Sequence, residues 1–78
     1  MSTSVARKEP RAVSVEVAKD HLKVTLADGR VISAPLEWFP ILRDAHPKQR
    51  NHWRLIGGGI GINWPDLDED ISIDGLLI

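Results

Sequence analysis

The chain has 78 residues, which is enough for one small domain that buries only about 60–65% of the surface its unfolded chain exposes. It contains no cysteine, which excludes disulfides and thiolate metal sites, and a formal net charge of −1 gives no general attraction to nucleic acids or anionic membranes. Because so small a core needs further stabilisation, a homodimer is one expectation. No apolar run approaches the roughly 18 residues of a membrane span, so we expect a soluble, cytoplasmic protein without a membrane partner.

The first segment, residues 1–11, mixes serine, basic residues, glutamate and proline without periodicity, which predicts a disordered N-terminal arm. Residues 12–78 then form the single folded domain. Within it, apolar and polar residues alternate over about 13–18, 22–27 and 30–34, and Asp28-Gly29 is a strong hairpin signal. The pattern predicts a three-stranded antiparallel meander.

The next segment changes to a helical period and predicts helices near 38–45 and 47–52. Pro47 favours the first position of its helix, since proline lacks the N–H that a helix interior requires. Pro40 leaves two alternatives: the first helix begins near Trp38 with Pro40 in its first turn, or it is kinked at Pro40. Two short apolar stretches, near 54–57 and 61–64, are separated by glycines and predict a second hairpin.

The last segment is predicted to be a loop, PDLDED, followed by a short C-terminal helix with Ser72 as N-cap and Asp74 in its first turn. The predicted fold class is therefore α+β. The expected core residues face inward from these elements and are Val13, Val15, Val17, Leu22, Val24, Leu26, Phe39, Leu42, Leu55, Ile62 and Leu76.

The glycine run that ends at Gly61 raises the question of a phosphate-binding loop. A P-loop needs a lysine and a serine or threonine after the glycines, and neither is present, so a tight hairpin turn is the better interpretation. The aspartates at 66, 68 and 70 match the start of a calcium loop. The match fails where Ile71 replaces the required glycine and Leu77 the bidentate glutamate, so no metal is expected.

Catalytic side chains are equally hard to find in this sequence. His21, His46 and His52 lack the spacing of a zinc pair, and no serine lies in the context of a nucleophile. We expect no catalytic residues, no metal and no cofactor, and therefore no enzyme.

Charge is distributed unevenly and supplies the two candidate surfaces. Residues 1–54 carry ten basic and six acidic side chains, whereas residues 55–78 carry five acidic side chains and no basic one. One hypothesis is a partner-binding acidic patch made of Asp66, Asp68, Glu69 and Asp70, with internal capping of the loop as the alternative. The other hypothesis is a basic, tryptophan-bearing surface for nucleic acid made of Arg43, Lys48, Arg50 and Arg54, which the C-terminal acids would oppose.

Two segments, ADGRVISAPLEWFPIL and NHWRLIGGGIGINWPDLDEDISIDGLL, closely resemble the bacterial domain-of-unknown-function family 2442. The resemblance spans residues 12–77 and implies an α+β fold without established chemistry. Members of that family are commonly encoded beside a second small protein, in an arrangement similar to a toxin and antitoxin pair, and some are fused to a helix-turn-helix. The resemblance therefore implies a non-enzymatic interaction module, antitoxin-like, whose partner is another small protein encoded nearby; a DNA-binding accessory is the alternative.

Overall fold

The computed structural model of the protein describes residues 10–77. Its elements are, in chain order, β1 (Ala12–Val17), β2 (His21–Leu26), β3 (Val31–Pro35), the 3-10 helix η1 (Leu36–Trp38), α1 (Pro40–Arg43), α2 (Pro47–Arg50), β4 (Arg54–Ile56), β5 (Gly61–Trp64), β6 (Glu69–Ser72) and α3 (Ile73–Leu76). None of the helices in this part of the chain has the length and apolar character needed to cross a membrane. Most of the predicted N-terminal arm, residues 1–9, lies outside the described residues.

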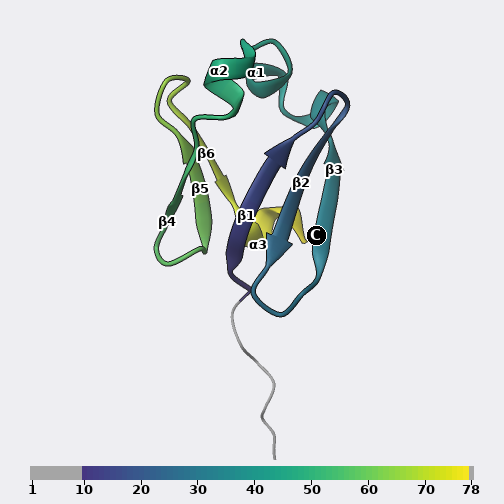
Figure 1. Ribbon diagram of the computed structural model, residues 1–78, viewed down its shortest axis with the longest axis vertical. Helices are drawn as coiled ribbons and strands as arrows, with labels where there is room; N and C mark the ends of the chain where they lie inside the picture. Colours follow the sequence, from purple (N-terminus) through teal and green to yellow (C-terminus); the bar gives the residue numbers. More distant parts are fainter. Residues whose placement is uncertain (1–9, 78) are drawn as a thin grey trace, which may run out of the picture.

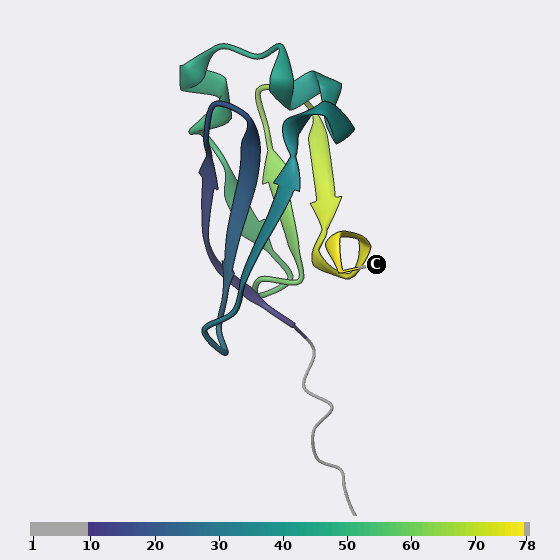
Figure 2. The ribbon, with the colours of Figure 1, turned by 90° about the vertical axis from the view of Figure 1, so that its right-hand side faces the viewer.

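The strands form two three-stranded antiparallel sheets, in the orders β1-β2-β3 and β4-β5-β6. Figures 1 and 2 show the two sheets face to face, with α1 and α2 closing one end and α3 following β6 near the other. This arrangement confirms the predicted α+β class and the predicted first meander. Each sheet hides its apolar face against the other.

The first sheet shows alternation most clearly in β2, where Leu22, Val24 and Leu26 are buried. The alternation breaks in β1, where the pairing register shifts between Ala12 and Ser14. This irregularity inserts Val13 as an extra residue, so its side chain points outward and is 54% exposed. The prediction of Val13 in the core is therefore wrong, and Ala12 takes the inward position with 2% exposure.

The core between the sheets contains the other predicted residues, and it also includes several that the sequence pattern did not select. Val17, Phe39, Leu55 and Leu76 are partly buried against its margin. The additional fully or nearly fully buried side chains are Ala12, Ala34, Leu36, Trp64, Ile71 and Ile73. Trp64 is the largest of them.

The helices are shorter than predicted because the segment around Pro40 divides into two turns. Residues 36–38 form η1, and Phe39 then leaves the helical region with φ −130° before Pro40 starts α1. Proline at the first position costs no intrahelical hydrogen bond, whereas in one continuous helix from Leu36 the Pro40 ring would clash with the carbonyl of Leu36. Pro47 begins α2 in the same way, as predicted.

The largest correction concerns the segment predicted to be a loop. Only residues 65–68 form the turn, and Glu69–Ser72 form β6, which adds a third strand to the predicted hairpin. Asp68 takes a left-handed backbone conformation with φ 53°, which aspartate tolerates better than most residues and which helps the chain reverse direction. Ser72 then caps α3, as predicted, with its Oγ accepting a hydrogen bond from Gly75 N at 3.3 Å.

Candidate partner-binding site

The four acidic residues proposed as a partner-binding patch lie on the β5–β6 turn and on β6, where strand pairing sets their directions. Asp70 is opposite Asn63 and Glu69 is opposite Trp64. Because side chains alternate along a strand, Asp70 faces solvent with Ser72, while Ile71 between them points into the core. The patch is therefore carried by an ordered hairpin, with its members facing in different directions.

Asp70 belongs to a row of polar side chains that crosses the outer face of the second sheet. Arg54 Nε on β4 donates to Asn63 Oδ1 on β5 at 2.9 Å, and Asn63 Nδ2 donates to Asp70 Oδ1 on β6 at 2.6 Å. The three residues are direct neighbours in register. They form a cross-strand ladder in which a cation and an anion polarise the amide between them.

Asp66 is also engaged within the domain, since its Oδ2 lies 2.8 Å from Nδ1 of His52. By contrast, Asp68 and Glu69 make no side-chain hydrogen bond or ion pair to any residue between 10 and 77. Asp68 is exposed and Glu69 is half-buried. Two of the four predicted acids thus have structural partners, and two present carboxylates without one in the described chain.

A groove runs beside β6 and was not predicted from the sequence. Its lining includes Trp38 and Phe39 at one end, Glu69, Asp70 and the rest of β6 along its side, and Gly75 and Leu76 at the other end. Trp38 is 66% exposed, an unusual position for so large an apolar side chain. The sequence pattern gives no signal for this exposure. In the structure, η1 has only three residues and buries Leu36, which leaves Trp38 outside the core.

The basic residues of the nucleic-acid hypothesis are mostly engaged in local contacts. Arg43 holds Asp44 through two hydrogen bonds of 3.0 and 3.2 Å, and this contact lowers the pKa of the Asp44 carboxyl and raises that of the Arg43 guanidinium. Arg54 belongs to the ladder described above, and Lys48 is exposed on α2. The four cations therefore do not form one uniform surface.

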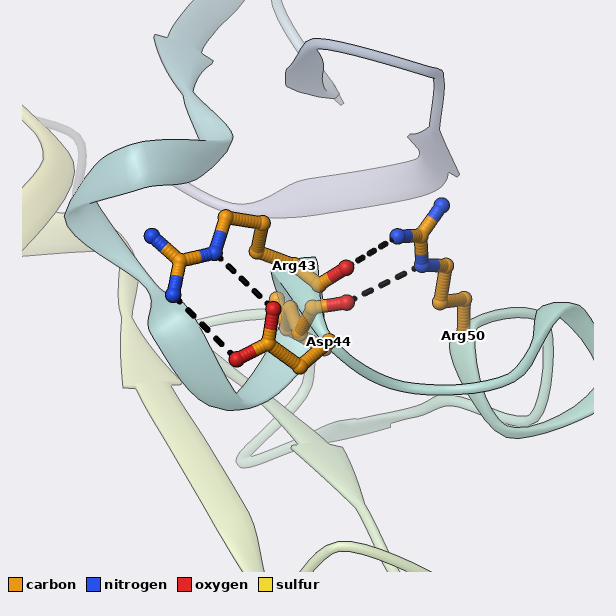
Figure 3. A network of polar contacts seen from close by, with 4 residues as sticks. Arg43, Asp44 and Arg50 are labelled. Carbon is orange, nitrogen blue, oxygen red and sulfur yellow. Dashed lines mark hydrogen bonds and ion pairs between the residues drawn. The ribbon is translucent and has the colours of Figure 1, made fainter.

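Arg50 has a structural role that Figure 3 shows directly. Its guanidinium donates to the carbonyl oxygen of Leu42 at 3.0 Å and to that of Arg43, satisfying acceptors at the C-terminal end of α1. Its own carbonyl oxygen accepts a hydrogen bond from the buried indole Nε1 of Trp64 at 3.0 Å. Arg50 therefore fastens α2 to α1 and to the core, and its half-buried side chain is not free for a ligand.

The glycine run forms the β4–β5 turn, with positive φ at Gly57, Gly58 and Gly59. Its carbonyl oxygens face the start of β1: Arg11 Nη1 donates to those of Gly57 and Gly58 at 3.2 Å each, and Ala12 N donates to that of Gly59 at 2.7 Å. These contacts give the turn an architectural role, as the sequence indicated. Within residues 10–77 no three histidine, aspartate or glutamate side chains gather as metal ligands.

Comparison with known proteins adds the family. The model of the family described as "Protein of unknown function (DUF2442)" matches residues 12–77, which include every described strand and helix. The chain belongs to DUF2442. The DUF2442 chain is also similar to a crystallised protein of unknown function from Rhodospirillum rubrum, with 29% sequence identity, a TM-score of 0.77, and coverage of 90% of this chain and 87% of that one. The search of curated proteins found no match.

Proposed function

We propose that this DUF2442 chain is a non-enzymatic protein-interaction module with an antitoxin-like role toward a second small protein in the cytoplasm. The observation that carries the proposal is the edge of the second sheet, where an acidic strand lies beside an exposed tryptophan. Tryptophan is enriched at the energetic centres of protein interfaces, and charges around it raise association rates. Asp68 and Glu69, which have no partner within residues 10–77, supply such charges.

The proposal is tested by co-expressing the full chain with the product of the adjacent gene and measuring the mass of the purified species in solution. We expect a heterocomplex of defined stoichiometry that persists at micromolar concentration. Recovery of the two proteins as separate species, at every salt concentration tested, would contradict the proposed function. Recovery of this chain only as a homodimer, without the second protein, would contradict it as well.

Reversing two charges should then separate recognition from stability. In the variant Asp68→Lys with Glu69→Lys, we expect association with the partner to slow by about tenfold at low salt, because long-range attraction is replaced by repulsion. The effect should shrink as salt rises. The melting temperature should fall only slightly. Neither carboxylate bonds to another described side chain, so the cost comes from residue 68, where lysine tolerates the left-handed backbone less well than aspartate.

Asp66→Lys is the matched control for this double variant. It changes charge in the same turn but breaks the contact with His52, so it should lower the melting temperature. Equal association rates for wild type and the double variant would rule out the recognition role. A lower melting temperature for Glu69→Lys alone, which leaves the left-handed residue 68 unchanged, would favour internal capping instead.

A DNA-binding accessory is the alternative hypothesis, supported by the exposure of Arg43 and Lys48 at the helical end of the domain. It predicts salt-sensitive binding of mixed-sequence DNA in fluorescence anisotropy. The slope of the logarithm of the binding constant against the logarithm of the salt concentration should become shallower by about one for each phosphate contact removed. Arg43→Ala and Lys48→Ala are the suitable variants, because Arg50→Ala would also release the end of α1. Anisotropy that stays flat at low salt would reject this alternative.

A further inference from the structure

We propose that β6 receives a partner by strand addition, and that the added strand is an extended segment of another protein in which lysine or arginine alternates with apolar residues. This inference rests on the proposed function and specifies its binding mode. The first observation is topological. β6 pairs only with β5 and is the outer strand of its sheet, and Figure 2 shows it at the margin of the molecule, below η1 and above α3.

The register shows which backbone groups of β6 face outward. Ile73 N donates to Ile60 O at 3.0 Å, which fixes the phase of the ladder between β5 and β6. Every second residue of an antiparallel strand bonds to the same neighbour, so Ile71 and Glu69 bond to β5, and Asp70 and Ser72 turn their backbone groups away from it. None of those outward N–H groups, nor Asp70 C=O, bonds to another residue between 10 and 77.

The space beside those groups has a suitable shape for an extended chain. The groove follows β6 and is bounded at its ends by Trp38 and Leu76. A peptide laid against Asp70 and Ser72 would gain main-chain hydrogen bonds, and its alternate side chains would meet the apolar ends of the groove. Main-chain bonds with alternating side-chain contacts are the general mode of recognition at a sheet edge.

Charge complementarity decides what occupies the groove. Its lining holds two acidic side chains, Glu69 and Asp70, and no basic one, and the hollow on the outer face of β6 adds Asp74. A second copy paired through β6 would bring the acidic strands of both copies together, and like charges across a strand pair are destabilising. A basic extended segment instead relieves the uncompensated charge of Glu69.

The test uses the full chain and a capped hexapeptide in which lysine alternates with valine, followed by NMR titration of the backbone amides. We expect the amide resonances of Asp70 and Ser72 and the indole resonance of Trp38 to shift together. The peptide with glutamate in place of lysine should bind at least tenfold more weakly. Two isomers of the lysine peptide, N-methylated at the backbone on alternate sets of residues, should differ in affinity by at least tenfold. Only one of them directs its methyl groups toward β6.

Two protein variants make the backbone contact testable from the other side. Ser72→Ala and Ser72→Pro both remove the hydroxyl that caps α3, but only proline also removes the outward N–H. We expect Ser72→Ala to bind the lysine peptide within twofold of wild type, and Ser72→Pro to bind it at least tenfold more weakly. If Ser72→Pro does not fold, the two methylated isomers still decide the question.

Equal binding of the methylated isomers, equal binding of the lysine and glutamate peptides, or shifts confined to other faces would overturn the strand-addition inference. The proposed function is judged separately by the heterocomplex. A heterocomplex that forms equally well with Ser72→Pro and Ser72→Ala leaves the interaction role standing and refutes β6 as its site. Absence of both the heterocomplex and peptide binding refutes both.

Discussion

Trp64→Ala is expected to remove a large part of the free energy of unfolding of the domain. The Trp64 side chain is fully buried at the end of β5, and truncating a buried aromatic residue to alanine costs about 3–5 kcal/mol. A domain of this size has a total free energy of unfolding of about 4–12 kcal/mol. Urea denaturation followed by circular dichroism should show a transition shifted to much lower urea, or an incomplete folded baseline.

Trp64→Phe is the matched variant that isolates the polar contact of the same side chain. Phenylalanine retains most of the apolar surface but removes the indole N–H, so the carbonyl oxygen of Arg50 loses its donor at 3.0 Å. An unsatisfied, partly buried acceptor costs about 1–3 kcal/mol. We expect Trp64→Phe to be folded and clearly less stable than wild type. A loss equal to that of the alanine variant would mean that the hydrogen bond, and not the packing, dominates.

The first sheet was predictable because each of its strands has one buried face, and a period of two is visible wherever that holds. The error at Val13 has a specific cause. An inserted residue changes which face each neighbour meets, and VSV has the same alternating pattern with or without the bulge. The closeness of Ala12 to the β4–β5 turn involves residues more than forty positions apart, which no local pattern encodes.

β6 was missed because its sequence, EDIS, has a single strongly apolar residue and directly follows the acidic turn PDLD. Edge strands are often short and charged, which keeps them from pairing with the wrong chain, so they lack the signal by which central strands are found. The acidic residues of the candidate site were therefore identified correctly as types, but assigned to a loop. The ladder from Arg54 through Asn63 to Asp70 depends on strand register and could not be predicted from spacing alone.

The glycine run provides the second prediction with a large effect. Gly59 has φ +107°, and a Cβ added there would lie 2.5 Å from Ala12 O and 3.0 Å from Ala12 N, much closer than real Cβ contacts allow. Gly59→Ala is expected to cost about 2–4 kcal/mol, the sum of backbone strain of about 1–3 kcal/mol and the loss of roughly 1 kcal/mol from the Ala12–Gly59 hydrogen bond. The measurement is the free energy of unfolding in urea.

Gly29→Ala separates strain from close approach, because Gly29 has a similar φ of +95° but no atom within 4 Å of an added Cβ. That variant should lose only about 1–2 kcal/mol, the ordinary cost of placing a side chain in left-handed backbone. The excess loss in Gly59→Ala would then measure how tightly the start of β1 must approach the β4–β5 turn for the two sheets to close on each other. Equal losses in the two variants would show that Ala12 can move aside, and that this glycine is needed for its backbone conformation alone.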